Sequence, residues 1–245
     1  MKNLKSYIAL VCTVALAVSC NNVLDTSPTN LLNDNQVWSS KNAIDAYLGQ
    51  LYDSMQVEDL EYQIESEGQY LSEFTDEAVR AYTWGRANYA LIPEGVFGWW
   101  GYKEVRNTNT FLDNINNAAA LTPEERKVYE AEARFCRAMN YFAMVKRYGG
   151  VPLVTVAQKY DGGDVKTLQL PRSKEYEIYD FIKEECQAIQ STLPESREGE
   201  DKYRATRYAA YALECRAMLY AASEAKYGNV QLNGLIGIPA EKAEG

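Results

Sequence analysis

The sequence predicts an all-α fold of repeated helix hairpins joined by long, irregular, aromatic-rich loops. The first observation is residues 123–148, where apolar side chains recur at the three- and four-residue spacing of one helix face. The second is an internal repeat, in which a shift of 79 residues aligns Cys136-Arg137-Ala138-Met139 with Cys215-Arg216-Ala217-Met218. The repeat predicts two successive hairpins, as in tetratricopeptide-like arrays, formed by residues 99–118 with 123–148 and 173–193 with 204–227.

The helix over 123–148 has the strongest signals at both of its ends. Thr122 is expected to be its N-cap and Pro123 its first residue, since proline is favoured where no backbone N–H is needed. Gly149 and Gly150 allow the turn that ends a helix, and Pro152 cannot continue one. Its apolar face is expected to hold Val128, Ala131, Phe135, Ala138, Met139, Phe142 and Val145.

The other helices are expected at 38–54, 99–118, 174–193 and 204–227. Ser39 or Ser40 is the expected N-cap of the first, and Ser173 that of the third. Asn109 falls on an apolar face, so we interpret it as part of a structural hydrogen-bond network. Three cysteines remain within helical patterns and are expected to pack as small apolar residues rather than to form a disulfide: Cys136, Cys186 and Cys215.

The N-terminus is typical of an exported lipoprotein. Lys2 and Lys5 precede an apolar run over 7–18 that is too short to span a bilayer. The small residues at 17–19 then lead to Cys20, a pattern that resembles a lipobox with an acylated cysteine. We expect a signal peptide over 1–19 and a lipidated tether over 20–35; the alternative is an ordinary signal peptide with an incidental cysteine.

Composition narrows the functional classes. The 245 residues carry a net charge of −9, which argues against nucleic acid or anionic lipid headgroups as partners. The chain has no histidine, which removes imidazole catalysis and the commonest transition-metal ligand. The irregular region 57–98 is rich in aromatic residues, and Tyr82, Trp84 and Tyr89 are the candidates for stacking on a ligand. Alternatively, these rings only pack the loop onto the helices.

Residues 132–154 (EARFCRAMNYFAMVKRYGGVPLV) resemble the signature helix of the SusD/RagB family of nutrient-binding lipoproteins of Bacteroidota. The chain departs from that pattern at Cys136 and Met144, where the family usually has leucine. Further similar motifs follow in the family's order, at Leu24-Asp25 with Pro28, at 99–112, at 170–173 and at 203–221. The resemblance covers nearly all of this chain but only about half of a typical relative, which suggests a truncated SusD-like N-terminal domain over 36–245.

The resemblance implies a non-enzymatic outer-membrane lipoprotein without a cofactor or metal, anchored through Cys20. Such proteins bind oligosaccharides, or in some members peptides, and deliver them to a SusC-like TonB-dependent β-barrel transporter. The polar start Asn21-Asn22 has few acidic neighbours, which leaves the membrane leaflet open between inner and outer. The lipid-anchored protein is nevertheless expected to face the cell surface.

Two other functions stay open at this point. The chain could be a helical-repeat scaffold at the envelope that binds no nutrient, or a carboxylate enzyme that uses Glu73, Asp76 and Glu77. The second is the weaker, because closeness in sequence does not set the separation that glycoside hydrolysis needs. Residues 161–164 (DGGD) could offer oxygen ligands to calcium, but they lack the EF-hand spacing and a polar turn is the better interpretation.

Overall fold

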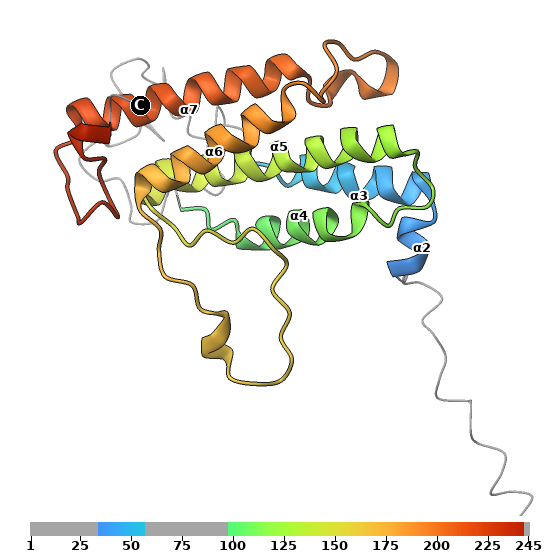
Figure 1. Cartoon of the computed structure of the whole chain (residues 1–245), viewed down its shortest axis with the longest axis horizontal. Coiled ribbons are helices and arrows are strands. Elements are labelled where there is room, and N and C mark those ends of the chain that lie inside the picture. The colour runs from blue at the N-terminus through green and yellow to red at the C-terminus, as the bar shows by residue number, and fades with distance from the viewer. Residues whose placement is uncertain (1–33, 57–97, 243–245) are drawn as a thin grey trace, which may run out of the picture. The chain divides into compact units, whose positions relative to one another are not determined.

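A computed structural model describes residues 34–56 and 98–242 of the chain (Figure 1). In these ranges every named element is a helix, and the only β pairing is a pair of isolated bridges to Ile236. The all-α fold class is therefore confirmed. The α-helices are α2 (Asp34–Trp38), α3 (Lys41–Asp53), α4 (Tyr102–Ile115), α5 (Pro123–Tyr148), α6 (Glu175–Ile189) and α7 (Arg207–Tyr227), and the 3-10 helices are η2 (Val165–Leu168), η3 (Gly199–Tyr203) and η4 (Ala240–Lys242).

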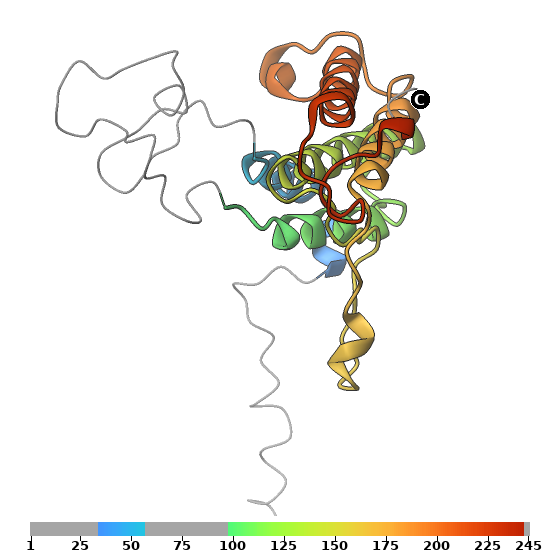
Figure 2. The same ribbon diagram turned by 90° about the vertical axis from the view of Figure 1, so that its left-hand side faces the viewer.

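Helix α5 is the centre of the compact unit that begins at Trp38. It packs against α4 on one side and α6 on another, and α6 in turn packs against α7 (Figures 1 and 2). The shorter helix α3 lies against both α4 and α5. The two hairpins predicted from the repeat, α4 with α5 and α6 with α7, are both present, with ends a few residues inside the predicted bounds.

The predicted ends of α5 are confirmed. The Thr122 hydroxyl accepts a hydrogen bond from the Glu125 backbone N–H at 3.2 Å, and the Glu125 carboxylate accepts one from the Thr122 N–H at 2.8 Å. This reciprocal capping box satisfies two backbone donors that the first turn leaves unpaired. At the other end Gly149 has φ +68°, a conformation that favours glycine.

The predicted N-cap of α6 is wrong. Lys174, not Ser173, stands at the cap position, and its backbone N–H donates to the Glu177 carboxylate at 2.7 Å. Ser173 stands one residue before the cap, where its N–H donates to the Val151 carbonyl at 3.1 Å. Its own carbonyl passes so close to Gly150 that a Cβ there would stand 1.9 Å from it. Ser40 of α3 and Thr206 of α7 are the caps of their helices.

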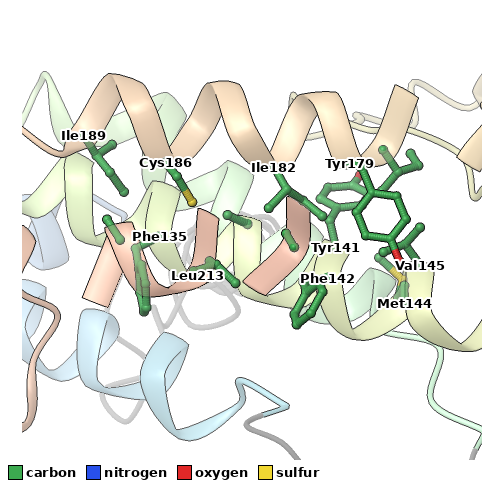
Figure 3. Close-up of a cluster of buried hydrophobic side chains, with 14 of the residues drawn as sticks. Phe135, Tyr141, Phe142, Met144, Val145, Tyr179, Ile182, Cys186, Ile189 and Leu213 are labelled. Carbon is green, nitrogen blue, oxygen red and sulfur yellow. The ribbon is translucent and has the colours of Figure 1, made fainter. Parts of the chain in front are cut away.

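The apolar core lies between α5, α6 and α7 (Figure 3). Cys136 and Cys186 are buried in it as predicted, whereas Cys215 is exposed, so the prediction that all three cysteines pack inside is wrong for Cys215. All three are free thiols. The labelled side chains are Phe135, Tyr141, Phe142, Met144 and Val145 of α5, Tyr179, Ile182, Cys186 and Ile189 of α6, and Leu213 of α7.

One buried ionic network joins α4, α5 and α6. The Arg137 guanidinium donates to the Glu185 carboxylate at 2.8 and 3.1 Å and to the Asn109 side-chain oxygen at 2.9 Å. Arg134 donates to the other Glu185 oxygen at 2.8 and 3.1 Å. The Asn109 amide donates to the Val154 carbonyl at 2.9 Å, so Asn109 is the structural network residue that the sequence predicted.

A second network joins α3, α5 and the segment between α6 and α7. Glu132 is fully buried, and its carboxylate accepts hydrogen bonds from Arg197 at 2.7 Å and from Arg204 at 2.8 and 2.9 Å. The Tyr52 hydroxyl donates to the same carboxylate at 2.8 Å and accepts from the Ala205 N–H at 2.9 Å. Each partner therefore compensates the cost of burying this charge.

Residues 161–164 form a polar turn, as the sequence predicts. The Gly163 N–H donates to the Asp161 carboxylate at 2.9 Å, and the Lys166 N–H donates to the Asp164 carboxylate at 2.9 Å. Over 34–56 and 98–242 no group of three or more acidic or cysteine side chains is placed to hold a metal ion. Among the helices in those two ranges none is both long and apolar enough to cross a membrane.

Replacing Glu185 by alanine should lower the free energy of unfolding by about 3–5 kcal/mol, because Arg137 would stay buried without its carboxylate. The matched control is Glu184→Ala, at the neighbouring and exposed position of the same helix. Urea unfolding followed by circular dichroism measures both. Equal losses for the two variants would show that the buried ion pairs contribute no more than a surface charge.

Candidate ligand-binding surface

The stacking candidates from the sequence, Tyr82, Trp84 and Tyr89, lie outside the described residues. So do the proposed acylation site Cys20 and the acidic group at 73–77. Their assignments stay predictions. The described residues that follow the aromatic-rich region in the sequence include two adjacent tryptophans, at 99 and 100.

An aromatic cluster stands where the chain enters α4. Trp100 is 56% exposed, and its ring centroid lies 5.0 Å from that of Tyr102 and 5.1 Å from that of Tyr148. The Tyr148 contact is edge-to-face, with an interplanar angle of 75°. We call Trp100, Tyr102 and Tyr148 the Trp100 platform. Its exposed member is the large Trp100 ring, which the rings of Tyr102 and Tyr148 contact and support.

The backbone around the platform restricts its movement. The Trp99 N–H donates to the Tyr148 hydroxyl at 2.7 Å, which ties the start of α4 to the end of α5. A Cβ at Gly101 would stand 2.1 Å from the Trp99 ring, so a larger residue there would displace that ring. Tyr148 in turn is the last residue of α5, directly before Gly149. The same features that end α5 therefore position the ring that supports Trp100.

Sequence reasoning did not single out Trp100. It placed Trp99 on the helix pattern, and in the structure Trp99 does pack partly buried against the core. The signal that could have identified Trp100 is the pair itself, because two adjacent tryptophans at a helix entry cannot both face the core. The one that faces away is then an exposed aromatic, which is rare enough to suggest binding.

A hollow of about 400 Å³ adjoins the platform. Arg172 borders it and donates to the Gly150 carbonyl at 2.6 Å and to the Tyr148 carbonyl at 2.5 Å, so this guanidinium also fixes the end of α5. Glu175 accepts from the Gly237 N–H at 2.7 Å, and burial raises the pKa of its carboxyl. The lining residues are Trp100, Val145, Lys146, Arg147, Tyr148, Gly149, Arg172, Glu175, Glu224 and Ile236.

A second hollow, of about 430 Å³, is a weaker candidate. It lies beside Asp45, Tyr129 and Arg204, whose polar groups already pair with one another or with Glu132. A ligand there would compete with the network that holds α3 to α5. The Trp100 platform has no such commitment on its exposed face, so we regard it as the better site.

Lys146 lines the hollow beside Trp100, and the pKa of its ammonium group is unusually low. Burial lowers its pKa to about 8, and the charges of Arg147 and Arg216 add to the effect. Its ammonium lies 4.6 Å from the centroid of the Phe142 ring, so its stem and head both rest against apolar surface. Near neutral pH Lys146 is therefore still charged, and this charge lowers the stability of the folded state.

Lys146→Met should make the protein more stable near pH 7, by about 1–3 kcal/mol, because the folded state no longer holds a disfavoured charge. In the unchanged chain the folded pKa is below the unfolded value of 10.5, so stability should rise as pH increases from about 8 to 10.5. The difference between the two proteins should accordingly shrink over that range. Thermal unfolding at pH 7 and at pH 10 measures it, with exposed Lys127→Met as control. A difference that does not change with pH would contradict the assignment.

Comparisons with known proteins agree on one family. The model of the SusD-like family described as "Starch-binding associating with outer membrane" matches residues 22–219. SusD-like protein P38 from Formosa agariphila is 24% identical over 202 residues, which make up 78% of this chain and 38% of that protein. This chain thus matches about two fifths of the relative's length.

Solved structures show the same likeness. The crystal structure of a SusD-like protein from Bacteroides fragilis has a TM-score of 0.58 and 29% identity, over 81% of this chain and 38% of that one. A laminarin-binding SusD-like protein has a TM-score of 0.57 and 18% identity, over 76% and 41%, and this likeness shows the fold alone. The helical fold, the aligned sequence and the family match over residues 22–219 agree, and the chain belongs to the SusD-like family of starch-binding, outer-membrane-associated proteins.

Proposed function

We propose that this protein binds a glycan at the cell surface and delivers it to a partner TonB-dependent β-barrel transporter. The family description, starch binding in association with the outer membrane, supports the ligand class and the location. The observation on this chain that carries the proposal is the Trp100 platform, an exposed tryptophan fixed by Tyr102 and Tyr148. The expectation of a transporter as the partner rests on the resemblance of residues 132–154 to the SusD/RagB signature helix.

The platform has the right chemistry for a sugar. The C–H face of a pyranose ring is apolar and packs on a flat aromatic face, while its hydroxyl groups need donors and acceptors at the edge. The hollow beside Trp100 is lined by both kinds, with the donor groups of Arg147 and Arg172 and the acceptor groups of Glu175 and Glu224, although Arg172 and Glu175 already make hydrogen bonds within the protein. Because the supporting rings are already packed, binding would order few side chains and lose little entropy.

Tyr82, Trp84 and Tyr89 remain part of the proposed site. They stand within twenty residues of Trp100 in the sequence, in the region that the resemblance assigns to the ligand-facing surface. We propose that they and the Trp100 platform contact one glycan. Two proteins of similar fold, a laminarin-binding SusD-like protein and a SusD-like carbohydrate-binding protein from Bacteroides fragilis, support a glycan over a peptide as the first ligand to test.

The proposed domain organisation serves this function. A signal peptide over 1–19 directs export, acylated Cys20 holds the protein at the outer membrane, and residues 20–35 tether the SusD-like domain that follows. The helical hairpins α4–α5 and α6–α7 form the rigid part of that domain. On this proposal the protein is a binding module and not an enzyme.

Trp84→Ala should abolish glycan binding, and Trp100→Ala should weaken it roughly tenfold, because each removes a proposed stacking face. Trp100 is 56% exposed, so its replacement should leave the packed core unchanged. Affinity electrophoresis against a panel that includes starch and laminarin measures both. Tyr203→Ala, which removes an 83% exposed ring elsewhere, is the matched control. Unchanged affinity would remove the altered tryptophan from the site, and release of shortened sugars would favour an enzyme instead.

The delivery role predicts a stable complex with a transporter. The lipidated, tagged protein should co-purify with a TonB-dependent barrel in equal amounts from outer membranes dissolved in detergent. Identification of the bound proteins by mass spectrometry tests this. Recovery of the folded, helical protein alone, together with no binding on the glycan panel, would instead support a scaffold at the envelope that binds no nutrient.

A further inference from the structure

Three basic side chains gather where the C-terminal part of α5 lies against α7. The Lys146 ammonium lies 4.6 Å from the centroid of the Phe142 ring and 5.9 Å from that of Tyr220. The Arg216 guanidinium lies 5.9 Å from the same Tyr220 centroid. Besides burial, the charges of Arg147 and Arg216 lower the pKa of Lys146. We call Lys146, Arg147 and Arg216 the basic cluster. Like charges this close repel one another, so the cluster favours an acidic neighbour.

One stretch of the sequence is acidic enough to neutralise this cluster. Residues 58–77 hold eight acidic side chains and no basic one, and the whole chain has a net charge of −9. Blocks of like charge repel themselves and often serve as interaction segments. We call residues 58–77 the acidic run. Its charged residues are Glu58, Asp59, Glu61, Glu65, Glu67, Glu73, Asp76 and Glu77.

The chain is held to α5 both before and after this run. Before it, the Tyr52 hydroxyl of α3 donates to the Glu132 carboxylate of α5 at 2.8 Å, and Met55 packs against the core. After it, the Trp99 N–H donates to the Tyr148 hydroxyl at 2.7 Å. Tyr148 directly follows the two members of the basic cluster that α5 contributes. The chain therefore returns from residues 57–97 to a point beside the cluster.

The face of α5 between these two points is buried beyond the end of α3. Asn140 and Ala143 continue the face of Glu132 by whole turns of the helix, and they are 1% and 2% exposed. Arg147 lies two turns beyond Asn140 on the same face, whereas α3 ends at Asp53. Neither polar atom of the Asn140 amide has a hydrogen-bond partner among the described residues. A buried amide normally has such partners, so this face calls for a neighbour with polar groups.

We propose that the acidic run packs on this face of α5 and pairs with the basic cluster. The charges are complementary, both flanks of the run are held at α5, and the carboxylates and backbone of the run offer polar partners for Asn140. Arginine stays charged at every working pH, so Arg147 and Arg216 pair with carboxylates wherever the acids are ionised. Lys146 contributes less, because the burial that lowers its pKa persists when the run covers it.

The consequence for ligand binding rests on the proposed function. Tyr82, Trp84 and Tyr89 stand between the acidic run and Trp99 in the sequence. A run held on α5 fixes the chain on both sides of these aromatic residues and keeps them near the Trp100 platform. Less conformational freedom is then lost when a glycan binds. The basic cluster thus positions the proposed stacking residues through the acidic run.

A carbodiimide, which joins an amine only to a carboxylate in contact with it, tests the pairing directly. In the purified full chain at low salt, the monomer band should contain Lys146 cross-linked to residues 58–77, identified by mass spectrometry. The yield should fall as salt is added, because salt screens ion pairs. Lys127, exposed on the same helix, is the control and should give no such link.

The absence of any link from Lys146 to residues 58–77 would overturn the proposal. The face would then belong to another occupant. One is an anionic ligand, and another is the further length of relatives such as SusD-like protein P38, of which this chain covers 38%.

Variants of Arg216 test the role of charge. Arg216→Gln should speed cleavage within residues 58–77 by a glutamate-specific protease several-fold, because the run loses an ion-pair partner. Arg216→Lys keeps the charge and should protect the run nearly as well as arginine does. Lys226→Gln, which removes an exposed charge from the same helix, is the control. Equal rates of cleavage in Arg216→Gln and in the unchanged chain would contradict the pairing.

The same variants separate this pairing from the proposed function. Arg216 is not among the described residues that line the hollow beside Trp100, so it has no direct part in glycan binding. Arg216→Gln should nevertheless weaken binding of starch or laminarin several-fold, and Arg216→Lys should restore it. Unchanged affinity in Arg216→Gln would overturn the positioning role. A Lys146 cross-link in a chain that binds no glycan would support the pairing and overturn the proposed function instead.

Discussion

The buried carboxylate of Glu132 is the interaction on which the arrangement of this domain depends. It sits on the central helix α5 and receives hydrogen bonds from α3 through Tyr52 and from the segment after α6 through Arg197 and Arg204. A buried charge tolerates no loss of its partners, so all three segments must be in place together. The network thus adds a specific polar contact between α3 and α5 to their apolar packing.

The second constraint is the way α5 ends, and it connects the fold to the proposed binding surface. Gly149 turns the chain, Gly150 lets Ser173 pass against it, and Arg172 binds the carbonyls of Tyr148 and Gly150. Tyr148 is thereby fixed, and it supports both Trp99 and Trp100. A local rule of helix termination, two glycines after the last apolar turn, thus also determines where an exposed aromatic face stands.

The sequence predicted what depends on local chemistry. Helix α5, its capping box at Thr122 and its end at Gly149 all follow from residues next to one another, and the structure has them as expected. The N-cap of α6 was missed because Ser173 is taken by Val151, a contact that no local pattern reveals. Cys215 was expected inside because apolar periodicity marks a face without telling whether anything covers it. Trp100 was overlooked because two adjacent tryptophans do not tell by themselves which ring packs on the core; in the structure Trp99 does, and Trp100 is exposed.

The long reach of the Glu132 network also has a consequence for how the chain acquires its structure. Arg197 and Arg204 follow Glu132 by 65 and 72 residues, and the Tyr52 hydroxyl meets a backbone group 153 residues away. Hairpin α4–α5 therefore precedes in the chain both arginines that neutralise its buried acid. Without them the ionised Glu132 would keep only Tyr52 as a partner, and its burial would carry an uncompensated cost of desolvation.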